Sequence, residues 1–179
     1  MYTTGEPMTA TRLSISRYDF HSLIDEQRIE AGAEIGVHHG WYSYYLLKHS
    51  KLKTLWSVDS YEGRHVHQKA DAEILLSEFG QRSKIIAARS VDAARQATVG
   101  GQRFGFVYID ADHSYQAVCD DLTLWYPIIL AGGILAGHDY LPTRHVEVIQ
   151  AVDEFVAAHN LELFITREKW ASWFVRKPA

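Results

Sequence analysis

Short runs of apolar and β-branched residues alternate along the chain with longer segments in which apolar residues recur every three or four positions. The short runs are typical of buried strands, and the longer segments are typical of amphipathic helices. Strands are expected at 33–37, 54–58, 84–88, 104–109 and 134–137, and helices at 41–49, 66–79, 91–98, 115–126 and 146–159. Such alternation favours a parallel sheet that is covered by helices.

The two ends of the chain depart from this alternation. Residues 18–29 form a leading helical pattern with no strand before it, and residues 1–17 are expected to be a flexible N-terminus. After the last helix, the runs 162–166 and 171–176 have the spacing of a β-hairpin. The sequence therefore predicts a single α/β domain over residues 18–179. Its sheet is expected to be Rossmann-like, doubly wound and mostly parallel, with a C-terminal antiparallel β-hairpin.

Composition narrows the class of protein. The chain has 179 residues, of which 47% are hydrophobic and 22% charged, as in an ordinary globular domain. The net charge of −4 argues against nucleic acid as a partner. No run approaches the 18 or so apolar residues of a membrane span, and the first residues lack the pattern of a signal peptide. Because Cys119 is the single cysteine, no intrachain disulfide can form, and we expect a cytoplasmic protein without membrane contact.

The first strand-to-helix junction reads E-x-G-x-x-x-G, with Glu34, Gly36 and Gly40. Glycines at such a turn let a ligand approach the backbone, and the helix start that follows offers unpaired N–H groups. A tight turn without a ligand explains this pattern equally well. Asp59 ends the second strand and lies 19 residues after Gly40, which suits an acid that binds ribose hydroxyls. A turn or helix-capping aspartate is the alternative, but the two signals together favour a ligand with a ribose.

Acids and imidazoles follow the fourth and fifth strands. Asp110 and His113 come after the fourth strand, and His138 and Asp139 come after the fifth. Because the carboxyl ends of neighbouring parallel strands line one crevice, we expect these four side chains to converge. They would form either a divalent-cation site or an acid–base centre. Asp112 is more simply explained as a cap of the next helix, and each histidine alone could be structural.

Three segments carry a family resemblance: AEIGVHHGWYSYYLL, WSVDSYEG and FGFVYIDADHSYQAVCDDLTLWYPIILAGGILAGHDY. They resemble the class I S-adenosylmethionine-dependent methyltransferases, and above all the small family-24 type, through I-D-x-D-H-x-Y and G-G-x-x-x-x-H-D-Y. The resemblance implies S-adenosylmethionine as cofactor. It places the methionine part at Gly36 and Gly40 with Glu34 bracing the loop, the ribose at Asp59, the adenine beside Arg89 and Ser90, and the sulfonium near Asp110.

The resemblance also raises the possibility that a divalent cation binds in the site. Related metal-dependent enzymes place ligands at the positions of Asp110, His138 and Asp139, but Mg²⁺ prefers oxygen ligands and His138 offers nitrogen. The sequence leaves open whether Mg²⁺, another divalent cation or no metal binds. For proton removal from the acceptor, His113 is the first choice of base and His138 the second, while Asp110 orients the acceptor.

The expected reaction is therefore O-methylation of a small molecule. An NAD-dependent oxidoreductase is an alternative that Asp59 favours, although the chain lacks a Tyr-x-x-x-Lys pair for hydride transfer. A non-catalytic cofactor-binding module is another, since a domain of this size has no room for a separate acceptor domain.

Two further features concern partners. Basic residues near the expected mouth suggest either an anionic or sugar-like acceptor or a solvated loop: Arg64, His65, His67, Lys69, Arg144 and His145. Aromatic residues crowd the helix 41–49, and only part of that ring can face the sheet. The remainder predicts a homodimer interface.

Overall fold

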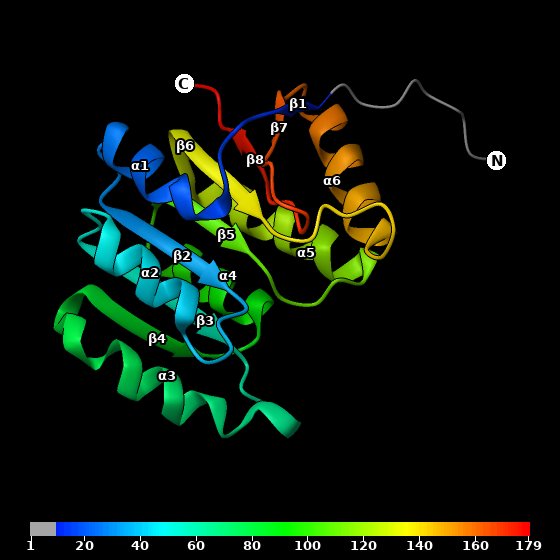
Figure 1. The fold of residues 1–179 in the computed structure, drawn as a ribbon. Helices are drawn as coiled ribbons and strands as arrows, with labels where there is room; N and C mark the ends of the chain where they lie inside the picture. Colours follow the sequence, from blue (N-terminus) through cyan, green and yellow to red (C-terminus); the bar gives the residue numbers. More distant parts are fainter. Residues whose placement is uncertain (1–9) are drawn as a thin grey trace.

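The computed structural model describes residues 10–179, apart from the side chain of Arg64. In this part of the chain, eight strands form one sheet with the order β1-β7-β8-β6-β5-β2-β3-β4 (Figure 1). The strands are β1 (Thr11–Arg12), β2 (Ala31–Ile35), β3 (Thr54–Asp59), β4 (Ser83–Ala87), β5 (Phe104–Ile109), β6 (Ile129–Gly137), β7 (Leu163–Ile165) and β8 (Trp173–Arg176). The α-helices are α1 (Phe20–Glu26), α2 (Trp41–His49), α3 (Gln68–Leu76), α4 (Ser90–Val99), α5 (Tyr115–Trp125) and α6 (Val146–Ala158), and the 3₁₀ turns are η1 (Arg17–Asp19), η2 (Gly63–His65), η3 (Ser77–Arg82) and η4 (Tyr126–Ile128).

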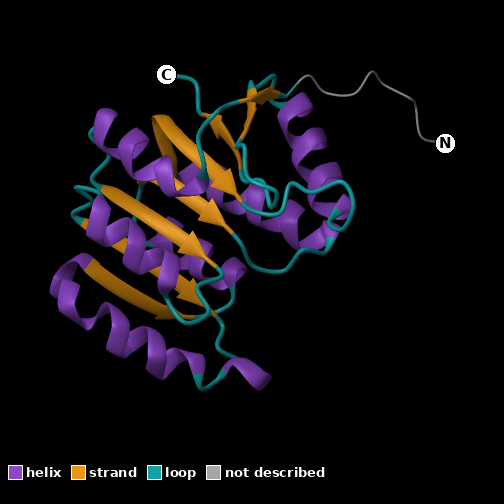
Figure 2. Ribbon diagram, viewed as in Figure 1, coloured by secondary structure: helices purple, strands orange, loops and turns teal. Residues whose placement is uncertain are grey.

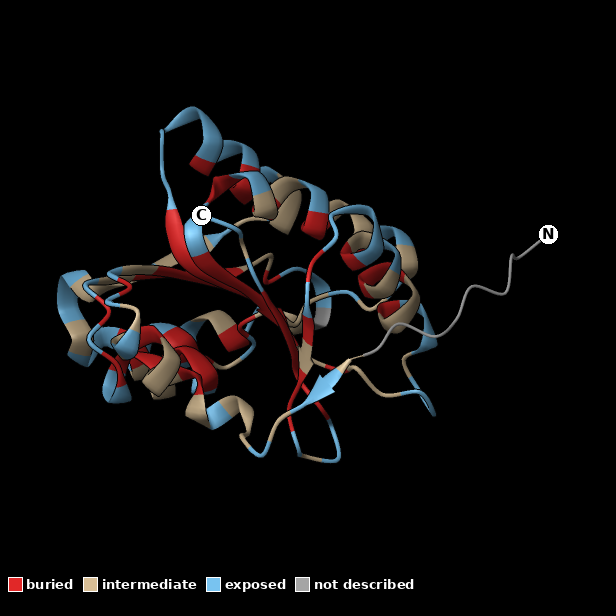
Figure 3. Ribbon diagram, turned by 90° about the horizontal axis from the view of Figure 1, so that it is seen from above, coloured by how far each residue is buried: buried red, intermediate tan, exposed pale blue. Residues whose placement is uncertain are grey.

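The sheet separates two apolar layers. Side chains alternate across a strand, so on β5 Phe106 and Tyr108 pack against one layer while Val107 and Ile109 pack against the other. The first layer contains α1, α2 and α3, and the second contains α4, α5 and α6. Helices lie on both faces of the sheet in Figure 2, and the central strands are the most buried part of the molecule in Figure 3. The central strands are therefore held rigidly, and their carboxyl ends share one edge.

The expected fold class is confirmed. Strands β2 to β6 pair in parallel, and β8 pairs antiparallel with both β6 and β7, as expected for the terminal hairpin. The bounds of α2 and β5 agree with those predicted from the pattern. The expected helix 66–79 is shorter, because α3 ends at Leu76 and gives way to a 3₁₀ turn in which Gly80 has a φ of +53°.

Residues 10–17 differ from the flexible segment expected there. Strand β1 pairs in parallel with β7, and the guanidinium of Arg12 donates to the carbonyl of Thr166 at 3.0 Å. The backbone N–H of Arg17 donates to Glu168 at 2.8 Å. A two-residue strand has no readable periodicity, so the pattern could not predict it. Residues 1–9, the rest of the expected N-terminus, lie outside the described residues.

Among the described helices, none combines the length and the apolar character needed to cross a membrane.

Candidate active site

A cavity of about 810 Å³ opens at the carboxyl ends of β2, β3 and β5. Its volume lies in the range of sites for small molecules and cofactors. Its lining includes the turn after β2, Asp59 and residues 88–91. It also includes Arg17, Trp41, Asp110 and His113. The cavity thus joins the two groups of residues that the sequence singled out.

The turn after β2 brings two strand ends into close contact. Gly36 has a φ of +91°, and a Cβ atom there would lie 2.0 Å from the carbonyl oxygen of Asp110. A side chain is therefore excluded at Gly36 by both conformation and space. His38 also has a positive φ, of +56°, and Gly40, at +86°, is the residue that precedes α2. This backbone path leaves the start of α2 beside the cavity.

Asp59 ties the same turn to the end of β3. Its Oδ2 atom accepts hydrogen bonds from the backbone N–H groups of Val37, at 3.0 Å, and His38, at 2.9 Å. Its Oδ1 atom accepts one from the N–H of Tyr61 at 2.9 Å. A carboxylate has about four lone-pair sites, so capacity remains for hydroxyl donors in the cavity. Asp59 therefore stabilises the turn, as the alternative of a turn aspartate predicts, and this role does not exclude ribose binding.

Glu34 lies beneath the turn and is buried. It accepts a hydrogen bond from the hydroxyl of Ser43 in α2, and that hydroxyl lies 2.7 Å from the hydroxyl of Ser57 in β3. Burial raises the pKa of Glu34 to about 8. The side chain thus links β2, α2 and β3 at the floor of the site.

Ser90, the first residue of α4, also lines the cavity and forms hydrogen bonds with two residues of α5. Its hydroxyl donates to Asp121 and accepts from the indole N–H of Trp125 at 2.9 Å. Burial raises the pKa of Asp121 to about 6. Arg89 is exposed, and the wall beside it is formed by the small apolar residues Ala88 and Ala117.

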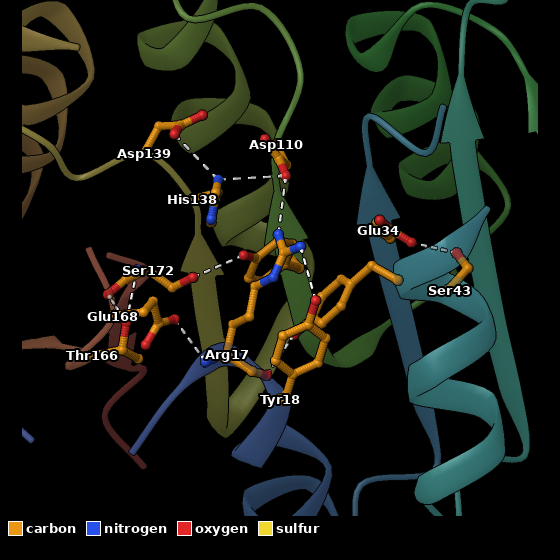
Figure 4. Close-up of polar contacts among 12 residues, drawn as sticks. Arg17, Tyr18, Glu34, Ser43, Asp110, His138, Asp139, Thr166, Glu168 and Ser172 are labelled. Atoms are coloured by element: carbon orange, nitrogen blue, oxygen red, sulfur yellow. Dashed lines mark hydrogen bonds and ion pairs between the residues drawn. The ribbon is translucent and has the colours of Figure 1, made fainter. Parts of the chain in front are cut away.

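The four strand-end side chains converge as expected. His113 Nε2 lies 3.0 Å from Asp139 Oδ2 and 3.6 Å from Asp110 Oδ1. His138 Nδ1 lies 3.2 Å from Asp139 Oδ1 and 3.8 Å from Asp110 Oδ2, so its ring bridges the two carboxylates in Figure 4. His145, just before α6, adds a third imidazole 3.9 Å from Asp139 Oδ1. Asp112 accepts from the N–H of Ser114 at 2.8 Å, so it stabilises the turn before α5 and does not cap the first turn of the helix.

Arg17 reaches the same place from the N-terminal segment, and the sequence analysis missed it. Its guanidinium lies 3.7 Å from Asp110 Oδ2 and over the rings of Tyr18 and Tyr42, at 5.2 Å and 5.1 Å from their centroids (Figure 4). The carbonyl of Arg17 accepts from the hydroxyl of Tyr42 at 3.0 Å. Nothing in the local pattern marks this arginine, because its position depends on contacts with distant parts of the chain.

A comparison with protein families shows to which family this fold and this site belong. The model of a family described as a methyltransferase domain matches residues 33–140, which is more than half of the chain. The chain belongs to this methyltransferase family. Its fold is that of the class I S-adenosylmethionine-dependent methyltransferases, so the family favours methyl transfer over the oxidoreductase considered above.

Relatives of this methyltransferase are distant. "Uncharacterized protein R132" of Acanthamoeba polyphaga mimivirus is 28% identical over 129 residues, covering 69% of this chain. The chain spans 58% of the length of that protein. An O-methyltransferase from Bacillus cereus, solved with S-adenosylhomocysteine, has a TM-score of 0.72 at 15% identity, covering 91% of this chain and 82% of that one. The O-methyltransferase TomG from Streptomyces achromogenes, solved with S-adenosylmethionine, has a TM-score of 0.73 at 15% identity, with 90% and 79% covered.

In this methyltransferase the carboxylates of Asp110 and Asp139 change the protonation state of His113. Contacts with Asp110 and Asp139 raise the pKa of His113 to about 10. Burial alone would raise the pKa of Asp139, but His113 and His138 hold it well below its usual range. Near neutral pH the His113 ring is therefore protonated in this arrangement. The choice of His113 as the base is consequently disfavoured, because an imidazolium cannot accept a proton.

The residues differ in how they face the cavity. Arg17, Asp110 and His113 line it, whereas His138 and Asp139 lie behind them. Within residues 10–179, two groups of side chains have ligand atoms within 4.8 Å of one another, as a metal ion requires. They are the expected Asp110, His138 and Asp139, and a second group formed by His113, Asp139 and His145.

Most of the basic residues that the sequence placed near the mouth do not line the cavity. His65 lines the cavity, and its ring lies 5.1 Å from that of His38. Lys69 pairs with Glu73, Arg144 lies over the ring of Trp170, and His67 is exposed. The side chain of Arg64 is outside the described part of the structure. The ring of basic residues expected from the sequence is therefore not formed by these side chains.

Proposed function

We propose that this protein transfers the methyl group of S-adenosylmethionine to an oxygen atom of a small molecule. The observation that carries the proposal is one cavity whose lining includes Asp59, Asp110 and His113. The cofactors bound by the Bacillus cereus and Streptomyces achromogenes O-methyltransferases support the choice of cofactor and of oxygen as acceptor.

Asp59 and the cavity residues near it fit this cofactor. The turn of Gly36 and Gly40 leaves backbone and a helix start beside the cavity, which suits the polar methionine part. Asp59 accepts three backbone hydrogen bonds and retains acceptor capacity at Oδ1 for a ribose hydroxyl. The small side chains of Ala88 and Ala117 leave room for a flat purine next to Arg89 and Ser90. The cofactor would then extend from residues 88–90 towards Asp110.

The cofactor supplies an activated methyl group, so the protein needs to align the acceptor and receive its proton. Asp110 and His113 are the members of the strand-end cluster that line the cavity. The positive charge of His113 would lower the pKa of a neighbouring acceptor hydroxyl. The Asp110 carboxylate would then accept the hydroxyl proton, while His138 and Asp139 hold the cluster in place from behind.

The cofactor assignment is tested by Asp59→Ala with calorimetric titration of S-adenosylhomocysteine. A hydrogen bond to a charged group contributes about 1.5–3 kcal/mol, so losing one should weaken binding at least tenfold. Asp71→Ala is the matched control, because Asp71 is an exposed acid that pairs with His39 outside the ribose position. Equal affinities of the Asp59→Ala variant and the wild type, with both folded, would contradict the assignment.

The acceptor class is tested with S-adenosylmethionine that carries a labelled methyl group. The protein should move the label into the small-molecule fraction of a metabolite extract, and Asp110→Asn should reduce this transfer by about 10²-fold or more. Label that appears only in protein or nucleic acid would contradict a small-molecule acceptor.

A further inference from the structure

A second group of metal-ligand side chains shares Asp139 with the first and adds His113 and His145. His113 Nε2 is 3.0 Å from Asp139 Oδ2, and His145 Nε2 is 3.9 Å from Asp139 Oδ1. The centroids of the two imidazole rings are 4.6 Å apart. His113 Nε2 is shielded from solvent, and no hydrogen-bond partner among the described residues is aligned with it. A donor atom buried in this way suits a ligand that lies between the three side chains.

The backbone holds these three side chains in fixed places. Asp139 has a φ of +58°, a strained conformation that the structure maintains between two backbone hydrogen bonds. The N–H of His138 donates to the carbonyl of Ile109 at 3.0 Å, and the N–H of Tyr140 donates to the carbonyl of Ala171 at 3.0 Å. His145 is fixed by its N–H, which donates to the carbonyl of Leu141 at 3.0 Å. The group is therefore organised before any ligand binds.

Arg17 distinguishes this group from the one that the resemblance implied. Its guanidinium lies 3.7 Å from Asp110 Oδ2 and cannot lose its proton near neutral pH. A divalent cation bound by Asp110 would therefore lie close to a permanent positive charge. The second group does not include Asp110, so its cation would not bind to the carboxylate that Arg17 contacts.

We propose that His113, Asp139 and His145 bind a divalent transition-metal ion. The ion displaces the proton that His113 carries in the metal-free protein. Two imidazole nitrogens and one carboxylate are a ligand set that Zn²⁺ and other transition metals accept, whereas Mg²⁺ prefers oxygen. Three protein ligands leave coordination positions for other oxygen atoms, and His113 lines the cavity. When bound, such a metal polarises an acceptor oxygen. Its use in methyl transfer rests on the proposed function, but metal binding itself does not.

Titration of the metal-free protein with Co²⁺ tests the site through the visible absorption of bound cobalt. The wild type should bind Co²⁺ in a one-to-one ratio, and Mg²⁺ at the same concentration should not displace it. His145→Ala and the more conservative His145→Gln should each weaken Co²⁺ binding at least tenfold. His159→Ala is the matched control, because His159 is an exposed histidine at the other end of α6. Asp110→Asn should weaken Co²⁺ binding less than His145→Ala does, because Asp110 contacts the ligand His113 without belonging to the ligand group.

Several outcomes would overturn the proposal. They are no Co²⁺ binding by the wild type, equal Co²⁺ affinity of both His145 variants and the wild type, or a loss in Asp110→Asn as large as that in His145→Ala. The last result would assign the metal to Asp110, His138 and Asp139. Titration of S-adenosylhomocysteine into the same samples separates the two proposals. Cofactor binding without Co²⁺ binding would refute the proposed metal site alone. Co²⁺ binding without cofactor binding would refute the proposed function alone.

Discussion

Replacing Glu34 with glutamine should change how the stability of the protein depends on pH. Glu34 is 3% exposed, and its carboxyl group contacts Ser43 between β2 and α2. Burial raises its pKa from 4.5 to about 8, so the folded protein holds a proton that the unfolded chain releases at lower pH. Glutamine has nearly the same shape and can still contact Ser43, but it does not titrate.

The two pKa values set the direction and size of the effect. Below pH 4.5 the carboxyl group is protonated in both states and contributes no pH dependence. Between pH 4.5 and pH 8 the unfolded chain ionises while the folded protein does not, so stability falls as pH rises. One pKa unit corresponds to about 1.4 kcal/mol, which gives a total loss of at most about 5 kcal/mol by pH 8. Above pH 8 the loss is constant.

Urea unfolding at a series of pH values from 5 to 9 measures this effect. The Glu34→Gln variant should gain stability relative to the wild type as pH rises, with unchanged slopes against urea. Glu162→Gln provides the control, because Glu162 is exposed. Asp121 also has a raised pKa, but it is present in both proteins and cancels in the comparison. Parallel stability profiles for the wild type and Glu34→Gln would refute the argument.

Two further predictions concern the turn and the assembly. Gly36→Ala should destabilise the protein by about 3 kcal/mol or more, because the new Cβ would overlap the carbonyl of Asp110 at an unfavourable φ. Gly101→Ala, at a φ of +68° with open space around it, should cost only about 1–2 kcal/mol, and equal losses in thermal or urea unfolding would contradict the packing argument. Trp41 is 69% exposed at the start of α2, so we predict a homodimer that Trp41→Ala weakens. Sedimentation that shows a wild-type monomer at micromolar concentration would contradict this prediction.

The order of strands and helices could be predicted because it depends on local periodicity. The convergence of Asp110, His113, His138 and Asp139 could also be predicted, since neighbouring parallel strands end at one edge. Strand β1 could not, because two residues carry no periodicity and β1 exists through its pairing with β7.

The position of Arg17 and the hydrogen bonds of Asp59 to the turn after β2 depend on contacts between segments far apart in the sequence. Arg17 approaches Asp110 across 93 positions of the chain, and no residue type near it signals that contact. Asp59 matched the spacing of a ribose-binding acid, but its hydrogen bonds to the N–H groups of Val37 and His38 follow from the shape of the turn. His113 was chosen as the base from its residue type, whereas its protonation state depends on the two carboxylates that the fold places beside it.

A crystal structure of the protein with S-adenosylhomocysteine is the decisive test of cofactor binding. The ligand should fill the cavity, with its ribose within hydrogen-bond distance of Asp59 and its sulfur directed towards Asp110. A ligand bound outside this cavity, or bound in it with the ribose away from Asp59, would contradict the cofactor assignment.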